Sequence, residues 1–230
     1  MSTENDRQNT AGRRKILQLV GVVGAAAGGL PFSWTGVAAE SRESAKTSGR
    51  SERTSQTAAA LRDLWVGHIF WVRNVSVAAL SKNEAAMKAA ERQAVANAES
   101  IAAAVEPFYG VAAKASFFKL LAGHYGAVKA YLVAAVDDNV SAQETATQSL
   151  SSNAEEIAIF LSKANPHLSK DGVHSLLLAH GGHHIQQIQE LKGHQYDAEA
   201  KTWEDMKHHI YAIADATADA LAKQFGSNFR

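Results

Sequence analysis

The sequence predicts an all-α protein, a six-helix bundle built from three αα-hairpin repeats with a sequence period of 56. Alanine is abundant, and apolar residues recur at spacings of three and four, which is the helical period. The motif Leu-x-x-Gly/Ala-His occurs three times at equal intervals, with its histidines at His68, His124 and His180. A period near this length with two helical patterns in each unit is typical of stacked helix hairpins.

The segments between these histidines follow the same period. An Ile-Ala pair occurs at 101–102, 157–158 and 213–214, and the residue four positions before each isoleucine is polar. Each predicted repeat therefore carries a histidine in its first helix and a polar residue in its second. Those polar residues are Asn97, Asn153 and His209.

Residues 1–39 predict an export signal of the twin-arginine type. Arg13 and Arg14 precede an apolar run rich in glycine and alanine, and small residues precede a predicted cleavage site after Ala39. The run is short and glycine-rich for a stable membrane span, so we expect cleavage and no permanent membrane anchor. The sequence thus predicts a periplasmic or secreted protein whose partner during export is the twin-arginine translocase.

Composition excludes several functions. Removing residues 1–39 takes away four basic and two acidic residues, which leaves a formal net charge of −2 and nothing to attract a nucleic acid. The chain has no cysteine, so disulfides, thiolate metal sites and a cysteine nucleophile are excluded. Residues 40–56 are polar and lack apolar periodicity, which predicts a disordered linker before a helical domain at 57–226. No feature of the sequence names a protein partner.

Capping and turn signals divide this domain into six helices. The first is expected at about 57–80, and capping boxes at Ser81-x-x-Glu84 and Ser141-x-x-Glu144 are expected to open the second and fourth. The remaining boundaries are signalled by Pro107, Gly110, the turn at 137–139, Pro166 and Gly193, with the fifth helix reaching Leu191 and the sixth at 197–225.

The repeated histidines lie on the apolar stripes of their helices, as do Asn97, Asn153 and His209. Buried polar groups need partners, and two interpretations supply them. In the first, hydrogen bonds inside each hairpin fix the helix register, pairing His68 with Asn97, His124 with Asn153, and His180 with His209. In the second, the three histidines meet on a shared axis and bind a transition metal.

The third repeat favours a metal. Where the first two repeats carry Val72 and Val128, the third carries His184, four residues after His180 and on the same helix face. That is the spacing of two ligands to one metal, and Gln187 continues the face. The predicted ligands of a divalent transition metal, either zinc, copper or iron, are His180, His184, His124 and His68. The residues predicted to support them are Asn97, Asn153, His209 and Gln187.

Gly181 and Gly182 lie in the middle of the same predicted helix, where each costs about 1 kcal/mol relative to alanine. Either the close approach of another helix or ligand, or a simple kink, would account for them.

The stretches LWVGHIFWVRN and His180-x-x-x-His184 together resemble the DinB and YfiT group of helical-bundle metal proteins. That resemblance implies a divalent metal held by an HxxxH pair and one histidine from another helix. Only His180 and His184 match the motif, and His124 is the candidate third ligand by geometry and not by motif. The threefold repeat departs from the four-helix pattern of that group.

Over the whole mature domain, the chain resembles a family of uncharacterised exported bacterial helical proteins, through LWVGHIFWVRN, EPFYG and the last helix. Some members carry the label acetylglutamate kinase. The sequence does not support a kinase, because it contains no strand-loop-helix pattern with a phosphate-binding glycine motif.

No catalytic motif can be identified from the spacing of the residues. Arg73, beside an apolar stripe, is expected at the surface, and Asp215 and Glu99 are the carboxylates with which it could pair. Three functions stay open: a metal-binding protein, a non-catalytic helical module that binds a partner or small apolar ligand, and a metal-dependent enzyme of DinB-like type.

Overall fold

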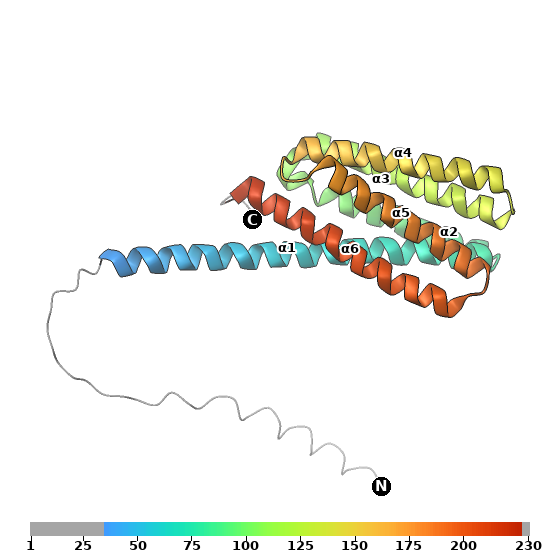
Figure 1. The fold of residues 1–230 in the computed structure, drawn as a ribbon, viewed down its shortest axis with the longest axis horizontal. Helices are drawn as coiled ribbons and strands as arrows, with labels where there is room; N and C mark the ends of the chain where they lie inside the picture. Colours follow the sequence, from blue (N-terminus) through green and yellow to red (C-terminus); the bar gives the residue numbers. More distant parts are fainter. Residues whose placement is uncertain (1–34, 227–230) are drawn as a thin grey trace, which may run out of the picture. The chain divides into compact units, whose positions relative to one another are not determined.

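The protein is described here by a computed structural model, which defines the backbone of residues 35–226 and the side chains of residues 52–226. Within this range the chain forms six α-helices and no strand, which confirms the predicted all-α class (Figure 1). Residues 1–34, which include the predicted twin-arginine motif, lie outside the described residues. The helices are α1 (Thr35–Leu80), α2 (Glu84–Ala103), α3 (Glu106–Val136), α4 (Val140–Ala164), α5 (Lys170–Lys192) and α6 (Tyr196–Phe225).

The chain divides into two compact units, Met1–Ser41 and Arg42–Arg230, and the helix bundle belongs to the second. Among the helices of the described residues, none combines the length and the apolar character needed to span a membrane.

The first helix begins earlier than the sequence predicted. The backbone of residues 40–56, where we expected a disordered linker, is helical and continuous with the rest of α1. This segment contains no proline, and Gly49 is its only glycine, so no residue in it stops the helix.

Asparagines, and not the predicted capping-box serines, begin α2 and α4. The side chain of Asn83 accepts a hydrogen bond from the Ala86 amide at 3.0 Å, and Asn139 accepts one from Ala142 at 3.0 Å. The residue before each asparagine has a left-handed φ, 56° in one hairpin and 55° in the other, which turns the chain back on itself. Asparagine is as good an N-cap as serine, so the helix begins where the turn ends.

From α2 to α6, helices that follow one another in the chain pack together, and the hydrogen bond from Asn97 to the Leu64 carbonyl ties α2 to α1. In addition, α5 contacts α3, and α6 is joined to α1 by the ion pairs Arg62–Asp215 and Arg73–Glu199. Two apolar clusters fill the interior. Members of the first cluster precede the histidine in α1, α3 and α5, namely Trp65, Leu121 and Leu177; members of the second follow it, namely Val72, Val128 and Ile188. The histidines therefore form a polar layer between two apolar ones.

Candidate metal centre

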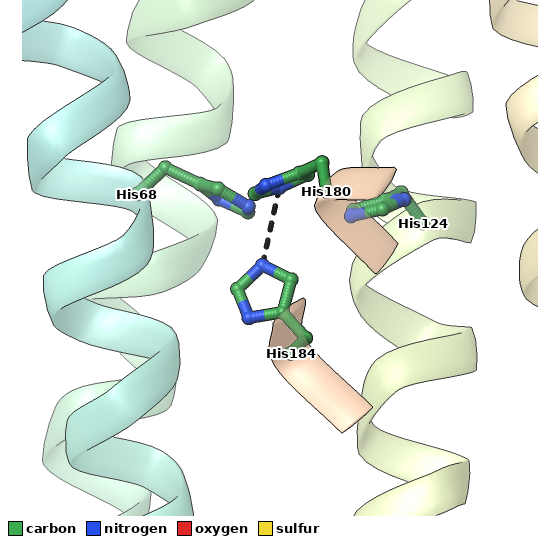
Figure 2. Close-up of side chains that lie close together, drawn as sticks. All are labelled: His68, His124, His180 and His184. Carbon is green, nitrogen blue, oxygen red and sulfur yellow. Dashed lines mark hydrogen bonds between the residues drawn. The ribbon is translucent and has the colours of Figure 1, made fainter. Parts of the chain in front are cut away.

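Three helices bring four histidines into one group. His68 comes from α1, His124 from α3, and His180 and His184 from α5 (Figure 2). Each contributes one ring nitrogen, and these nitrogens all lie within 4.8 Å of one another. The four side chains are 5%, 3%, 1% and 1% exposed, so the group lies in the interior of the bundle. The four histidines predicted from the sequence as metal ligands therefore lie close together in the structure.

The rings are arranged in two levels. Figure 2 shows His68, His180 and His124 at one level, and His184 pointing toward them from the next turn of α5. The Nε2 atoms of His180 and His184 are 3.1 Å apart, and the His124 ring stacks on the His180 ring with 5.4 Å between centroids. Nitrogens around a tetrahedral ion with bonds of about 2.0 Å are about 3.3 Å apart. The His180–His184 pair is near this separation, and the remaining nitrogens, all within 4.8 Å of one another, would reach it after small movements of the rings.

All four imidazoles are held in the neutral form that binds metals. Burial lowers the pKa of His68 to about 3, with a further contribution from the charge of His124. Burial also lowers the pKa of His124 to about 4, against the opposing effect of the nearby Asn153 amide. The pKa values of His180 and His184 lie well below the usual range for the same main reason, burial.

Several ring nitrogens in this group have no hydrogen-bond partner. They are Nε2 of His68, both nitrogens of His124 and Nδ1 of His180. A buried polar group without a partner costs about 1 to 3 kcal/mol. A metal ion bound to one nitrogen of each ring would relieve much of this cost, so the residues present fit such an ion.

Three of the four residues predicted to support the ligands form hydrogen bonds to the backbone. The Asn97 side chain donates to the Leu64 carbonyl at 2.9 Å, and the Asn153 side chain donates to the Leu120 carbonyl at 3.0 Å. In the third hairpin, His209 Nε2 donates to the Leu176 carbonyl at 2.7 Å. Among the described side chains, no hydrogen bond joins a histidine of the group to the residue expected as its partner within the hairpin.

The glycines that precede His68 and His124 explain how the asparagines reach the backbone. A Cβ atom on Gly67 would lie 2.8 Å from Asn97 Nδ2, and one on Gly123 would lie 3.1 Å from Asn153 Nδ2. A side chain at either position would therefore occupy the space that the amide needs. The Gly-His pairs in the sequence contained this signal, although spacing alone did not show what it meant.

Gln187 forms a hydrogen bond with a carboxylate, Glu199, that the sequence analysis did not identify. Its Nε2 donates to Glu199 Oε1 at 2.8 Å, and Arg73 donates to both oxygens of Glu199, at 2.6 and 2.8 Å. Glu199 is buried, and its pKa is lowered chiefly by the Arg73 hydrogen bonds. The expected partners of Arg73 were therefore wrong, since Asp215 pairs with Arg62. Glu199 could have been found from its place seven residues before Met206 on the apolar stripe of α6.

Of the two adjacent glycines in α5, only Gly181 lies where a side chain would clash with a neighbouring helix. A Cβ on Gly181 would lie 2.8 Å from Leu150 Cδ2, which shows that α4 approaches closely there. A Cβ on Gly182 would meet nothing within 4 Å.

Comparisons with protein-family models, with curated proteins and with solved structures found no match for the chain. The function of the chain is therefore inferred from the site itself. The described residues form an all-helical bundle whose interior holds four neutral histidines close enough to bind one metal ion. No carboxylate belongs to this group of described ligand atoms, so its chemistry is that of four neutral nitrogen donors.

Proposed function

We propose that this chain is an exported metal-binding protein that holds one transition-metal ion through His68, His124, His180 and His184. The observation that carries the proposal is the convergence of four buried ring nitrogens within 4.8 Å. Neutral imidazoles suit zinc, copper and iron. The proposed role is binding, since no nucleophile or carboxylate shares the group among the described residues.

The unpartnered ring nitrogens favour a metal over a purely structural role. If the histidines served only to fix the helix register, hydrogen bonds to neighbouring polar groups would have to satisfy them. Instead, both nitrogens of His124 lack a partner, and the Asn153 side chain donates its N–H to the backbone carbonyl of Leu120.

Asn97 and Asn153 fit a supporting role for bound histidines. The Oδ1 atom of each is buried and has no hydrogen-bond partner. A metal-bound imidazole commonly donates its other N–H to an acceptor, which fixes the orientation of the ring. We assign this role to Asn97 for His68 and to Asn153 for His124, after small rotations of the rings as the ion binds.

The threefold repeat and the export signal are part of the same proposal. Three turns at equivalent positions of the repeats each contain a residue with a left-handed φ, namely Lys82, Asp138 and His194. The bonds that tie the second helix of each pair to the first all reach back 33 residues. These equivalences support a tripled hairpin in which the third copy gained His184.

Elemental analysis of the untagged protein, purified from its own cells, tests metal binding. We expect one transition-metal ion per chain, and its loss in the double variant His180→Ala, His184→Ala. The variant His208→Ala is the matched control, because His208 is exposed and lies outside the group. A native protein without metal, which also fails to take up zinc, copper or iron after purification, would disprove the proposal.

Export is tested separately by fractionating the cells. We expect the mature chain in the exported fraction with its first residue near Glu40, and we expect Arg13→Lys with Arg14→Lys to hold it inside. A mature chain that keeps residues 1–39 would contradict this part alone.

A further inference from the structure

The charge of the ligands narrows the choice of ion, provided that the proposed function holds. A carboxylate or thiolate ligand brings negative charge to a metal, whereas an imidazole brings none. All four donors here are imidazoles. The bound ion therefore keeps its full charge inside the bundle, two positive charges for Zn(II) or Cu(II) and one for Cu(I).

The surroundings do little to neutralise that charge. The histidine layer lies between the two apolar clusters, and the buried carboxylates among the described side chains are Glu190 and Glu199. Glu199 is already held by two hydrogen bonds from Arg73. Glu190 follows His184 by six residues, which is about 9 Å along the helix. Neither carboxylate belongs to the group of ligand atoms.

The cost of an uncompensated charge in an apolar interior rises with the square of the charge. A divalent ion therefore bears four times the desolvation cost of a monovalent ion of equal size. The monovalent alkali ions prefer oxygen donors, so they do not compete for four ring nitrogens. Among the ions of the first transition series that bind imidazole, copper is the one with an accessible monovalent state.

The same charge argument separates the two oxidation states of copper. Cu(II) brings two positive charges into the four imidazoles, as Zn(II) does, whereas Cu(I) brings one. Charge therefore disfavours both Zn(II) and Cu(II) relative to Cu(I).

We infer that the four-histidine centre is selective for monovalent copper. This inference rests on the proposed function and adds the identity and oxidation state of the ion.

The test is an anaerobic competition experiment on the metal-free protein. Cu(I), Cu(II) and Zn(II) are each titrated against a chelator of known affinity. We expect a dissociation constant for Cu(I) at least 100-fold below that for Zn(II), and a reduction potential for the copper-loaded protein above that of copper in excess imidazole. Tighter binding of Zn(II) or Cu(II) than of Cu(I) overturns the inference and leaves metal binding intact. Binding of none of the three overturns both.

A matched pair of variants tests the role of charge directly. Val128 is buried one turn after His124, at the place in α3 that His184 holds in α5. Val128→Asp puts an anionic oxygen beside the ion, and Val128→Asn puts a neutral group of the same shape there. We expect Val128→Asp to reduce the preference for Cu(I) over Zn(II) at least 10-fold relative to Val128→Asn. An equal ratio of Cu(I) to Zn(II) affinity in the two folded variants contradicts the charge argument. If either variant fails to fold, the competition experiment on the unmodified protein alone tests the inference.

Discussion

Replacing His124 with leucine is expected to change the stability of the protein in opposite directions with and without metal. In the metal-free protein, both ring nitrogens of His124 are buried and have no hydrogen-bond partner. Each such group costs about 1 to 3 kcal/mol. Leucine removes both nitrogens and suits the apolar clusters on either side, while an imperfect fit costs less than about 1.5 kcal/mol. We therefore expect His124→Leu to raise the free energy of unfolding of the metal-free protein by roughly 1 to 3 kcal/mol.

The metal-loaded protein should behave in the opposite way. An ion present at 100 times its dissociation constant adds about 2.7 kcal/mol to the stability of the unmodified chain. His124→Leu lacks one of the four ligands and should lose most of that gain. For a domain of this size, each kcal/mol corresponds to roughly 2 to 4 °C in melting temperature.

Thermal unfolding followed by circular dichroism, with chelator or with metal, measures both effects. His209→Leu is the control, because its ring donates to the Leu176 carbonyl and lies outside the group of ligand atoms. It should lower the melting temperature by a similar amount in both conditions. If His124→Leu also lowers stability equally in both, the imidazole has a structural role and our reasoning is wrong.

Three further results are expected. Burial lowers the pKa of His68 to about 3 and that of His124 to about 4. Below pH 6.5 the unfolded chain therefore binds more protons than the folded chain, so the stability of the metal-free protein should fall as the pH drops from 6.5 toward 4. Urea unfolding at pH 7, 6 and 5 measures this loss, which is at most about 1.4 kcal/mol per pH unit for each group. Gly67→Ala should lower stability by about 1 kcal/mol, because its Cβ would displace the Asn97 amide and the lost bond outweighs the gain in helix propensity. Gly182→Ala should raise stability by about 1 kcal/mol, since its Cβ meets nothing within 4 Å.

Each of these results has its own control. The pH dependence should be shallower in His124→Leu, and an unchanged slope would show that the imidazole does not titrate as described. The two glycine variants serve as controls for each other, because both add the same methyl group to an exposed or partly exposed helix position. A similar change in stability in both would show that the Asn97 amide is not displaced.

The helical class and the four histidines could be predicted because both depend on spacing along the chain. Residues three and four apart share a face of a helix, so the sequence placed His180 and His184 together and set His68 and His124 on apolar stripes. A polar residue on an apolar stripe is expected to be buried, and the four histidines are.

The partners of these residues could not be predicted, because they depend on the rotation and spacing of helices that are distant in sequence. The periodicity placed Asn97 opposite the first helix but did not show whether its amide meets the imidazole of His68 or the carbonyl of Leu64. The absence of a side chain at Gly67 decides this. In the same way, Glu199 meets Arg73 only because α6 packs beside α1.

The burial of all four imidazoles would control how fast an ion bound as proposed could leave. The four side chains are 1% to 5% exposed, so we expect such an ion to depart only when a helix of the bundle moves away from its neighbours. Its residence time would then be set by the frequency of that opening, and stabilising substitutions should prolong it. We therefore expect slow loss of a bound ion to competing ligands, a behaviour that suits storage better than rapid transfer.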